Sequence, residues 1–567
     1  MSESSMPAAP GGQDHFQRGE SAQKNPGQGE GGQGGEGADH GGESSIKETI
    51  ESILVAFILA FIFRAFVVEA FVIPTGSMAP TLLGANMRFV CPDCGYQFEV
   101  NYSPPGQSDA EDLQIPSEGT PAADVYCPNC GYHVSGRGDA VPVRFGDRIL
   151  VLKYIYLVHE PRRWDVVVFK SPDKPDAFHY TMNFIKRLVG KPGERLMVLD
   201  GDIYVSTAGD PTWRIQTKPP AVQEALWRLV YDNDFYPQHV VREGQRDWVQ
   251  PWRPQSGSGW SLGTDASNRR TFRFDNLEGA GQIAFDPNAN STTQTLTNYL
   301  VYDIGAELRR PGAVGSVDDE RACPVSDLKL ALYYRRTSGD GPLRLKLSRH
   351  ESVDHTFTAE IGPQTVRLLH RTNGGEQQIG PTVKLADLGI APAKAVLVEL
   401  QNVDYQVTLR LDGQEVLQST PADYAPNVAW LLQQWRERRH GRPGEAEIEA
   451  QRQSCTLEHV GLWRDVYYTN RRPDNGEPFT WASPTSPVVL GDDEYFVMGD
   501  NSDVSADARY WDRDITLPQE GLDVKSGRVP EQFLLGQAVF VYWPAGFRAF
   551  DSRFSIIPDF GDMRWIH

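Results

Sequence analysis

The stretch that decides the architecture runs from residue 71 to residue 83 and reads Phe71-Val-Ile-Pro-Thr-Gly-Ser-Met-Ala-Pro-Thr-Leu-Leu83. Its apolar, β-favouring start predicts a strand, and the Pro-Thr-Gly that follows predicts a turn that presents Ser77. A serine hydroxyl in such a turn lies near backbone N–H groups that can receive an oxyanion. Most isolated serines belong to ordinary surface turns, so the rest of the chain has to decide between the two interpretations.

The length and charge of the chain limit the classes of protein that it can be. With 567 residues, we expect more than one domain. The net charge of −20 argues against nucleic acid as a partner, because phosphate binding requires a basic surface. Residues 1–45 are rich in Gly, Ser and Gln, which predicts a disordered tail. The tail lacks the basic start and apolar core of a secretory signal peptide.

An unbroken apolar run, Ile53 to Phe63, follows the tail. With its apolar continuation to Val68 it predicts a single transmembrane helix over residues 46–69, with Arg64 reaching toward the interface. The alternative is a buried core helix. Lys47 and Arg64 lie on opposite sides of the run, so the positive-inside rule does not set the orientation.

Four cysteines form two matching pairs within residues 91–138. Cys91-Pro-Asp-Cys94-Gly-Tyr is repeated as Cys127-Pro-Asn-Cys130-Gly-Tyr, which predicts a zinc-ribbon-like insertion with a closed, structural Cys₄ zinc site. The alternatives are two disulfides or redox-active pairs. The Pro- and Ser-rich stretch 103–124 between the pairs predicts a loose loop. Cys323 and Cys455 stand apart, either paired with each other or as buried thiols.

The remainder of the chain is dominated by strand patterns. One strand around residue 186 places Lys186 on the same face as Phe184 and Leu188, an unusual position for a lysine unless it is buried or paired. Residues 201–485 alternate strongly and predict an inserted antiparallel sandwich, loosely similar to concanavalin-like or laminin-G-like jelly rolls. Within this region the pattern predicts strands over 328–334, 343–347 and 403–411, a hairpin turn at Asp412-Gly413 and a helix over 428–439.

Five separated blocks carry a resemblance to a known family. Besides the apolar helix they are Ser77-Met-x-Pro-Thr-Leu82, Arg163-x-Asp-Val-Val-Val-Phe169, Lys186-Arg-Leu-Val-Gly-x-Pro-Gly193 and Gly499-Asp-Asn-Ser-x-x-Ser-x-Asp507-x-Arg509. In this order the blocks resemble bacterial-type signal peptidase I, a membrane-anchored serine protease with a Ser–Lys dyad. The resemblance covers about residues 50–90, 141–200 and 488–545.

Acid–base chemistry supports the resemblance. His159 and His179 lie in polar, loop-like sequence, so neither is a convincing base for Ser77. A lysine acts as a base near pH 7 only if its pKa falls from about 10.4 by roughly two units or more. The apolar neighbours of Lys186 suit such a change, whereas Lys191 adjoins a Pro-Gly turn.

The resemblance implies a role for each matching residue. Ser77 is the expected nucleophile and Lys186 the general base. Further expected roles are an oxyanion hole of Thr75 with the Ser77 N–H, orientation of Lys186 by Ser505, and a supporting ion pair of Asp507 with Arg509. The resemblance also implies pockets for small substrate residues, lined by Ile73, Pro74, Met78, Leu82, Phe184 and Ile185. Ser502 replaces an arginine that is common in the family, and Val504 follows Asp503, so contacts of this loop are expected to differ.

These expectations combine into one hypothesis: a mainly β, signal-peptidase-type antiparallel catalytic domain after one N-terminal transmembrane helix, with a sandwich inserted into it. The catalytic segments are expected at 70–90, 139–200 and 486–567, on the outer face of the cytoplasmic membrane. The expected substrates are signal peptides of exported preproteins, cut after Ala-x-Ala-like sequences without a catalytic cofactor. Expected further contacts are with membrane lipid and, for residues 201–485, with a glycan or envelope partner.

Two other functions are weighed against this hypothesis. One is a self-cleaving Ser–Lys protease of the repressor type, which requires a DNA-binding domain that the sequence does not show. The other is a membrane-tethered glycan-binding protein with relic protease blocks, against which the intact Ser77, Lys186 and Ser505 argue.

Overall fold

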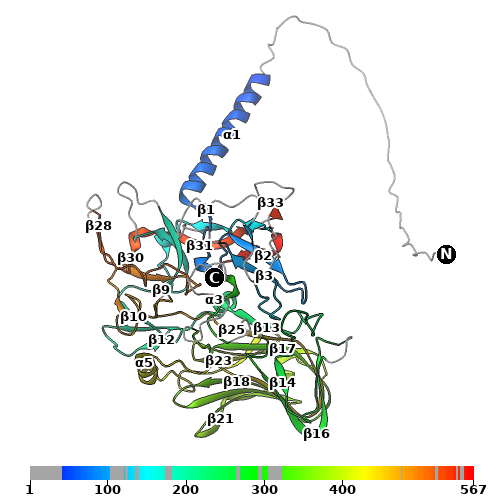
Figure 1. The fold of residues 1–567 in the computed structure, drawn as a ribbon. Coiled ribbons are helices and arrows are strands. Elements are labelled where there is room, and N and C mark those ends of the chain that lie inside the picture. Colours follow the sequence, from blue (N-terminus) through cyan, green and yellow to red (C-terminus); the bar gives the residue numbers. More distant parts are fainter. Residues whose placement is uncertain are drawn as a thin grey trace, which may run out of the picture. The chain divides into compact units, whose positions relative to one another are not determined.

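The computed structural model describes most of the chain. The described residues are 41–102, 120–121, 125–134, 140–172, 182–263, 268–290, 296–303, 322–391, 393–473, 475–517, 522–544, 547–548, 555–557 and 559–567. Residues 1–40 of the expected tail, most of the expected loop 103–124, and His179 lie outside them. The described residues form a mainly β fold, as predicted (Figure 1). They divide into two compact units, residues 1–61 and 62–567, and all the described strands belong to the second.

Helix α1 (Gly41–Phe66) covers the segment for which a membrane span was expected. It begins before residue 46 and ends before residue 69, because strand β1 (Val68–Val72) follows it. In the part of the chain that the structure describes, no helix is both long enough and apolar enough to cross a membrane. The expected transmembrane helix over 46–69 is therefore corrected. Its unbroken apolar core, Ile53 to Phe63, is shorter than the roughly 20 residues that a span requires.

An antiparallel sheet of eight strands carries most of the family-like blocks. Its strands are β1, β7 (Arg148–Leu152), β31 (Leu534–Trp543), β8 (Val166–Lys170), β9 (Asn183–Gly190), β27 (Glu494–Met498) and β30 (Val529–Pro530) in spatial order, with β34 (Arg564–Trp565) beside β31. Apolar β-branched runs such as that of β8 favour extended structure and bury both faces. The late strand β31 lies between β7 and β8, so distant parts of the chain complete one sheet.

A second sheet of four strands shares a core with the first. In order it contains β12 (Arg214–Ile215), β11 (Asp202–Thr207), β10 (Glu194–Leu199) and β26 (Val488–Val489). Trp164, Phe169 and Leu188 of the first sheet region belong to one buried apolar cluster with Leu196 and Val198 of β10. The tight turn between β10 and β11 uses Asp200 and Gly201 with positive φ angles. This hairpin crosses the expected boundary at residue 200.

The region expected to be inserted, residues 201–485 (the insertion below), contains a sheet of thirteen antiparallel strands, many of which lie in the lower part of Figure 1. Nine of these strands pair with one another in the order β21–β20–β19–β18–β25–β17–β22–β23–β24. In addition, β13 and β16 pair with β25, and β14 and β15 pair with β16. In chain order these strands are β13 (Arg228–Asp232), β14 (Trp252–Pro254), β15 (Trp260–Leu262), β16 (Phe272–Phe285), β17 (Leu328–Gly339), β18 (Leu343–His350), β19 (Asp354–Ile361), β20 (Thr365–Thr372), β21 (Gly375–Lys384), β22 (Val396–Val403), β23 (Gln406–Leu411), β24 (Gln414–Gln418) and β25 (Ala446–Arg464).

Several local predictions for this region are confirmed. The strands expected over 328–334 and 343–347 are present as β17 and β18, and α5 (Val428–Arg436) is the expected helix. Asp412 and Gly413 form the β23–β24 turn with positive φ. The strand expected over 403–411 is instead interrupted by a turn at Asp404 and Tyr405, which separates β22 from β23.

Shorter elements complete the described chain. The cysteine region contains the sheet β3 (Gln97–Asn101), β2 (Asn86–Val90) and β6 (Val143–Arg144). The two-stranded pairs are β4 (Thr120–Pro121) with β5 (Ala140–Val141), β28 (Ile515–Leu517) with β29 (Leu522–Val524), and β32 (Phe547–Arg548) with β33 (Ser555–Ile557). The short helices are η1 (Gly76–Met78), α2 (Ile155–Val158), α3 (Pro220–Leu226), η3 (Val301–Asp303), η4 (Leu385–Leu388), η5 (Glu531–Phe533) and η6 (Phe560–Asp562).

Candidate active site

Ser77 lies in the single turn of helix η1, directly after β1 and the Pro-Thr-Gly turn. Thr75 precedes η1 with an extended backbone, which redirects the chain out of the strand. Gly76 is packed so closely that an added Cβ would lie 2.6 Å from the ring of Tyr302. The tight packing fixes the backbone on one side of Ser77, while Ser77 itself is only half-buried.

Lys186 lies on β9 and meets Ser77 across 109 residues of sequence. Its Nζ is 2.8 Å from Ser77 Oγ and 3.1 Å from the carbonyl oxygen of Ile185. The Phe184 ring centroid lies 5.5 Å from the same nitrogen. Lys186 is 5 % exposed, so the pair of side chains combines a buried amine with a half-buried hydroxyl.

The backbone N–H of Ser77 is available to a ligand. Among the described residues it donates no backbone hydrogen bond outside η1, and the Thr75 side chain makes no capping hydrogen bond to η1. The Ser77 carbonyl oxygen instead accepts a hydrogen bond from the Asn501 N–H at 3.1 Å. A free N–H beside a nucleophile is what an oxyanion hole requires.

A group of residues that the sequence analysis did not identify holds the turn at residues 74–77, called the nucleophile turn below because Ser77 is the expected nucleophile. The Asn501 side chain donates to the carbonyl oxygen of Gly76 at 3.2 Å and to the Asp303 carboxylate at 2.7 Å. Asp303 and the neighbouring Tyr302 belong to η3, within the inserted region. The insertion therefore contacts the nucleophile turn directly. The Gly-Asp-Asn motif was the available signal, but it does not name the partner in the insertion.

Residues 499–509 form a polar loop that is largely buried, although Ala506 is exposed. Asp507 and Arg509 make the expected ion pair, with two contacts of 2.8 Å, and Asp507 also accepts the Gly499 N–H. Ser505 is buried, but its hydroxyl has no hydrogen-bond partner among the described residues, so the expected bond to Lys186 is not formed. An added Cβ at Gly499 would lie 2.2 Å from Ser505 Oγ and 2.4 Å from the Ser77 carbonyl oxygen. Ser505 thus lies close to the nucleophile turn without bonding to the lysine.

The departure at Ser502 has a structural explanation. Its hydroxyl accepts a hydrogen bond from Arg509 at 2.7 Å and another from the Thr469 N–H at 2.8 Å. Thr469 follows β25, at the end of the insertion. A small hydroxyl at this position lets the returning chain pack against the buried loop.

Two further buried charges stabilise this loop from the other side. Arg187, adjacent to Lys186, makes a bidentate ion pair with Asp500 at 2.6 and 2.7 Å, and both side chains are fully buried. Arg187 also donates to the carbonyl oxygens of Trp164 and His567. The pair therefore joins β9, the polar loop and the end of the chain.

The six residues expected to line substrate pockets fall into two groups. Ile73, Met78 and Leu82 are at most 3 % exposed and belong to a buried cluster with Ile149 and Val151. Pro74, Phe184 and Ile185 are partly exposed. Only the second group therefore presents surface beside the Ser77–Lys186 pair.

The four paired cysteines converge in one buried cluster. The two knuckles fold alike: Gly95 and Gly131 adopt positive φ angles, and their N–H groups donate to Cys91 and Cys127 respectively, each at 2.9 Å. The Cys91–Cys130 and Cys94–Cys127 sulfur atoms lie 3.7 and 3.6 Å apart. Sulfur atoms about 3.8 Å apart are expected around tetrahedral zinc, against about 2.05 Å in a disulfide. The donor set therefore fits one zinc ion rather than two disulfides.

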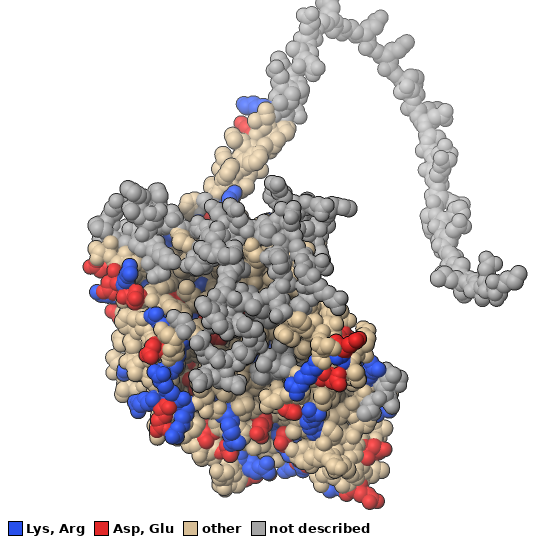
Figure 2. Space-filling view, in the orientation of Figure 1, with Lys and Arg blue, Asp and Glu red and all other residues tan. Residues whose placement is uncertain are grey.

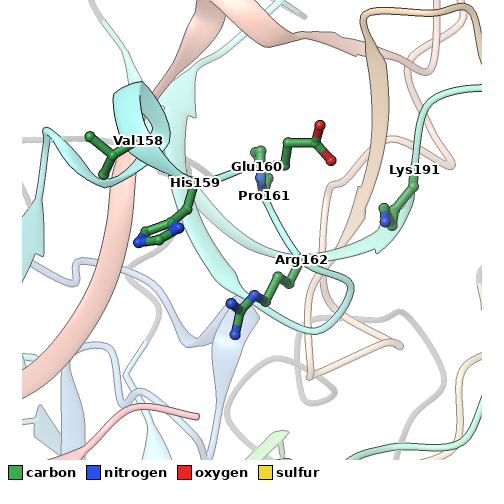
Figure 3. Close-up of a pocket in the computed structure, with 6 residues that line it drawn as sticks. All are labelled: Val158, His159, Glu160, Pro161, Arg162 and Lys191. Carbon is green, nitrogen blue, oxygen red and sulfur yellow. The ribbon is translucent and has the colours of Figure 1, made fainter.

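One cavity is lined by residues other than Ser77 and Lys186. It has a volume of about 410 Å³ and lies at the end of α2, as Figure 3 shows. It is lined by Val158, His159, Glu160, Pro161, Arg162 and Lys191. His159 is exposed here, consistent with the sequence-based interpretation that it is not the base.

Comparisons with known proteins bear on the same blocks. A family model described as signal peptidase, peptidase S26, matches residues 46–105, 131–234 and 434–543. Signal peptidase I of Rickettsia typhi is 26% identical over 162 residues, which cover 29% of this chain and 44% of that protein. A probable signal peptidase I-2 of a Synechocystis species is 34% identical over 64 residues, or 11% of this chain and 29% of that protein.

The chain matches less than half the length of either of these relatives. Among solved structures, a carbohydrate-binding module from Bacillus subtilis covers 38% of this chain and 96% of its own, at 10% identity and a TM-score of 0.21. A likeness at that level supports no conclusion about the insertion. The family model, over somewhat less than half of the chain, and the curated relatives, over less than half of their own length, show that these segments are similar to signal peptidases.

Proposed function

We propose that the protein is a serine endopeptidase that removes signal peptides from exported preproteins, with Ser77 as nucleophile and Lys186 as general base. The observation that carries the proposal is the 2.8 Å separation of Lys186 Nζ from Ser77 Oγ, with the lysine buried. Hydroxyl and amine lie within the distance that direct proton transfer requires. The backbone N–H of Ser77 lies next to this pair and has no competing partner among the described residues.

The proposed reaction has two stages, acylation of Ser77 and hydrolysis of the resulting ester. Ser77 Oγ attacks the carbonyl carbon of the scissile peptide bond while its proton passes to neutral Lys186. The resulting oxyanion is stabilised by the Ser77 N–H and the Thr75 hydroxyl. The lysine then protonates the leaving amine, the peptide bond breaks, and an acyl-enzyme on Ser77 remains. Water, deprotonated by the same lysine, hydrolyses the ester and restores the serine.

The proposed substrate contacts are the partly exposed Pro74, Phe184 and Ile185. Apolar surface next to the nucleophile suits the small, uncharged residues that precede the cleavage site of a signal peptide. Helix α1 supports a location at a membrane, because its apolar side chains from Ile53 to Phe63 are about half exposed or more and lipid can cover them. We place the catalytic domain on the outer face of the cytoplasmic membrane, where exported chains emerge.

Zinc has a structural role in this proposal. Cys91, Cys94, Cys127 and Cys130 use all four tetrahedral positions, so no position is left for a substrate or a water molecule. Asp93 of the first knuckle bonds Arg242, and Asn129 of the second bonds the backbone of Phe235 and Asp232. The cluster therefore fixes the knuckles to the inserted region, away from the dyad chemistry.

Cleavage of a preprotein with an Ala-x-Ala site by the full chain in detergent tests the proposal. Ser77→Ala and Lys186→Ala should each lower kcat by at least about a thousandfold, because either change removes an essential group. Lys191→Ala is the matched control, since Lys191 is the neighbouring lysine and lies outside the pair; it should cleave within about threefold of wild type. Substantial cleavage by Lys186→Ala would contradict the proposed base.

A further inference from the structure

A cluster of buried carboxylates lies where the β10–β11 hairpin meets the inserted sheet. Asp202 begins β11, Asp327 precedes β17, and Asp404 lies in the turn between β22 and β23. One carboxylate oxygen of each lies within 4.8 Å of the other two. The three residues are 4, 6 and 3 % exposed. Carboxylates this close in a protein interior repel one another unless positive charge or protons compensate them.

The neighbouring cationic side chains, Lys218 and Arg349, form ion pairs with only some of these carboxylates. Lys218 contacts Asp404 and lies 2.8 Å from Asp465, and Arg349 donates to Asp327 at 2.6 Å. Asp202 makes none of these contacts. Its Oδ2 is buried and has no hydrogen-bond partner among the described residues, although it lies beside two other carboxylates. A buried carboxylate oxygen without a donor is costly, so the site lacks a positive group at this point.

A second unpartnered group lies on the same side of β11. Tyr204 follows Asp202 by two residues, so both side chains occupy one face of the strand. Tyr204 is fully buried, and its hydroxyl has no hydrogen-bond partner among the described residues. A phenol oxygen beside carboxylates is a further oxygen ligand for a cation.

A small cavity lies at the same place. Its volume of about 10 Å³ corresponds to one water-sized sphere. It is lined by Asp200, Asp202 and Asp327 together with residues 324–326, Arg349 and the Val466–Tyr467 stretch. The space therefore admits one atom-sized ligand next to the uncompensated carboxylate.

We propose that Asp202, Asp327 and Asp404 bind one divalent cation, Ca²⁺, where the β10–β11 hairpin meets the sheet of the insertion. Ca²⁺ binds oxygen at about 2.3–2.6 Å, so two ligand oxygens on opposite sides lie up to about 5 Å apart, which the spacing of these carboxylates allows. Mg²⁺ keeps several bound waters and demands a tighter octahedron, for which the cavity has no room. The ion supplies the missing positive charge and joins β11 to the inserted sheet. This inference does not depend on the proposed protease activity.

Calorimetric titration of the zinc-loaded full chain with Ca²⁺ alone tests the site, with Mg²⁺ as a second arm and thermal unfolding as a second readout. Wild type should bind one Ca²⁺ per chain and unfold at a higher temperature with Ca²⁺. Asp202→Asn should weaken binding by at least about tenfold, because it removes a charged ligand. Without Ca²⁺ the same variant should unfold at a higher temperature than wild type, because one buried negative charge is gone.

The control variant is Asp340→Asn, since Asp340 is an exposed carboxylate paired with Arg452 outside the cavity; it should bind Ca²⁺ like wild type. Absence of Ca²⁺ binding to wild type at millimolar concentration would overturn the proposal, as would equal affinity in Asp202→Asn. Mg²⁺ binding as tight as that of Ca²⁺ would overturn the choice of ion. If Asp202→Asn were more stable than wild type by the same amount with and without Ca²⁺, the charge of the cluster would be compensated by a protonated carboxyl and not by a cation.

Discussion

Replacement of Asn501 by alanine should impair catalysis although Asn501 does not touch the reacting atoms. Its side chain ties the carbonyl oxygen of Gly76 to the carboxylate of Asp303, at 3.2 and 2.7 Å, and is 1 % exposed. A hydrogen bond to a charged group contributes about 1.5–3 kcal/mol. If this energy positions Ser77, its loss lowers kcat/KM by about tenfold to a hundredfold, because each 1.4 kcal/mol is a factor of ten.

Steady-state cleavage of a preprotein is the assay. The fall should appear in kcat with KM within about twofold of wild type, because Asn501 acts on the nucleophile turn and not on bound substrate. Asn298→Ala is the matched control. Asn298 also joins the insertion to the polar loop, by a 2.7 Å bond to Asp503, but it does not contact the nucleophile turn.

Two results would refute this reasoning. Activity of Asn501→Ala within twofold of wild type would show that Ser77 is positioned without the insertion. An equal loss in Asn298→Ala would show that general loosening of the interface, and not the contact with the Gly76 carbonyl, lowers the rate.

Three further predictions concern stability. Arg187→Met should lower the free energy of unfolding by about 3–5 kcal/mol, because it leaves the fully buried Asp500 carboxylate without its bidentate partner; chemical denaturation measures it, and a loss below about 1 kcal/mol would contradict it. Cys94→Ser should abolish zinc binding, measured by elemental analysis, and lower the unfolding temperature. If wild type contained no zinc and its four cysteines did not react with a thiol reagent, the cysteines would instead form disulfides. Burial, and then the neighbouring His355, lowers the pKa of His370 to about 4. The unfolded chain therefore binds the proton more readily than the folded chain. The free energy of unfolding should be unaffected by His370 above about pH 6.5 and should fall as the pH drops toward 4. In His370→Gln this fall should be smaller.

Short-range features were the most predictable from sequence. The turn after β1, the Asp412–Gly413 hairpin turn and α5 follow from local residue preferences, and the structure contains all three. The two cysteine knuckles were equally predictable, because each is formed by residues that are close together in the sequence. The bounds of the first helix were less predictable, because α1 runs from Gly41 to Phe66 whereas a membrane span was expected over residues 46–69.

The proximity of Ser77 and Lys186 was predicted from ordered sequence blocks, and the structure places the two side chains in hydrogen-bond contact. The partners of these blocks were less predictable. Asp303 meets Asn501 only because the insertion folds back on the catalytic loop, and no local pattern encodes that contact. Ser505 likewise lies close to the nucleophile turn, yet a bond between its hydroxyl and one particular nitrogen depends on distances that sequence does not specify.

Figure 2 shows that Lys, Arg, Asp and Glu side chains are interspersed on the visible face, where colour is assigned. Although the net charge of the chain is −20, both positive and negative side chains occur on this face.

The position of β31 between β7 and β8 has a consequence for the order of events during synthesis. A ribosome makes β7 and β8 several hundred residues before β31, so the central sheet stays open until residues 534–543 have emerged. The insertion is complete earlier, and the pairing of β13 with β25 holds its two ends together, which shortens the loop that β31 has to close. We expect the insertion to fold first and the nucleophile turn last.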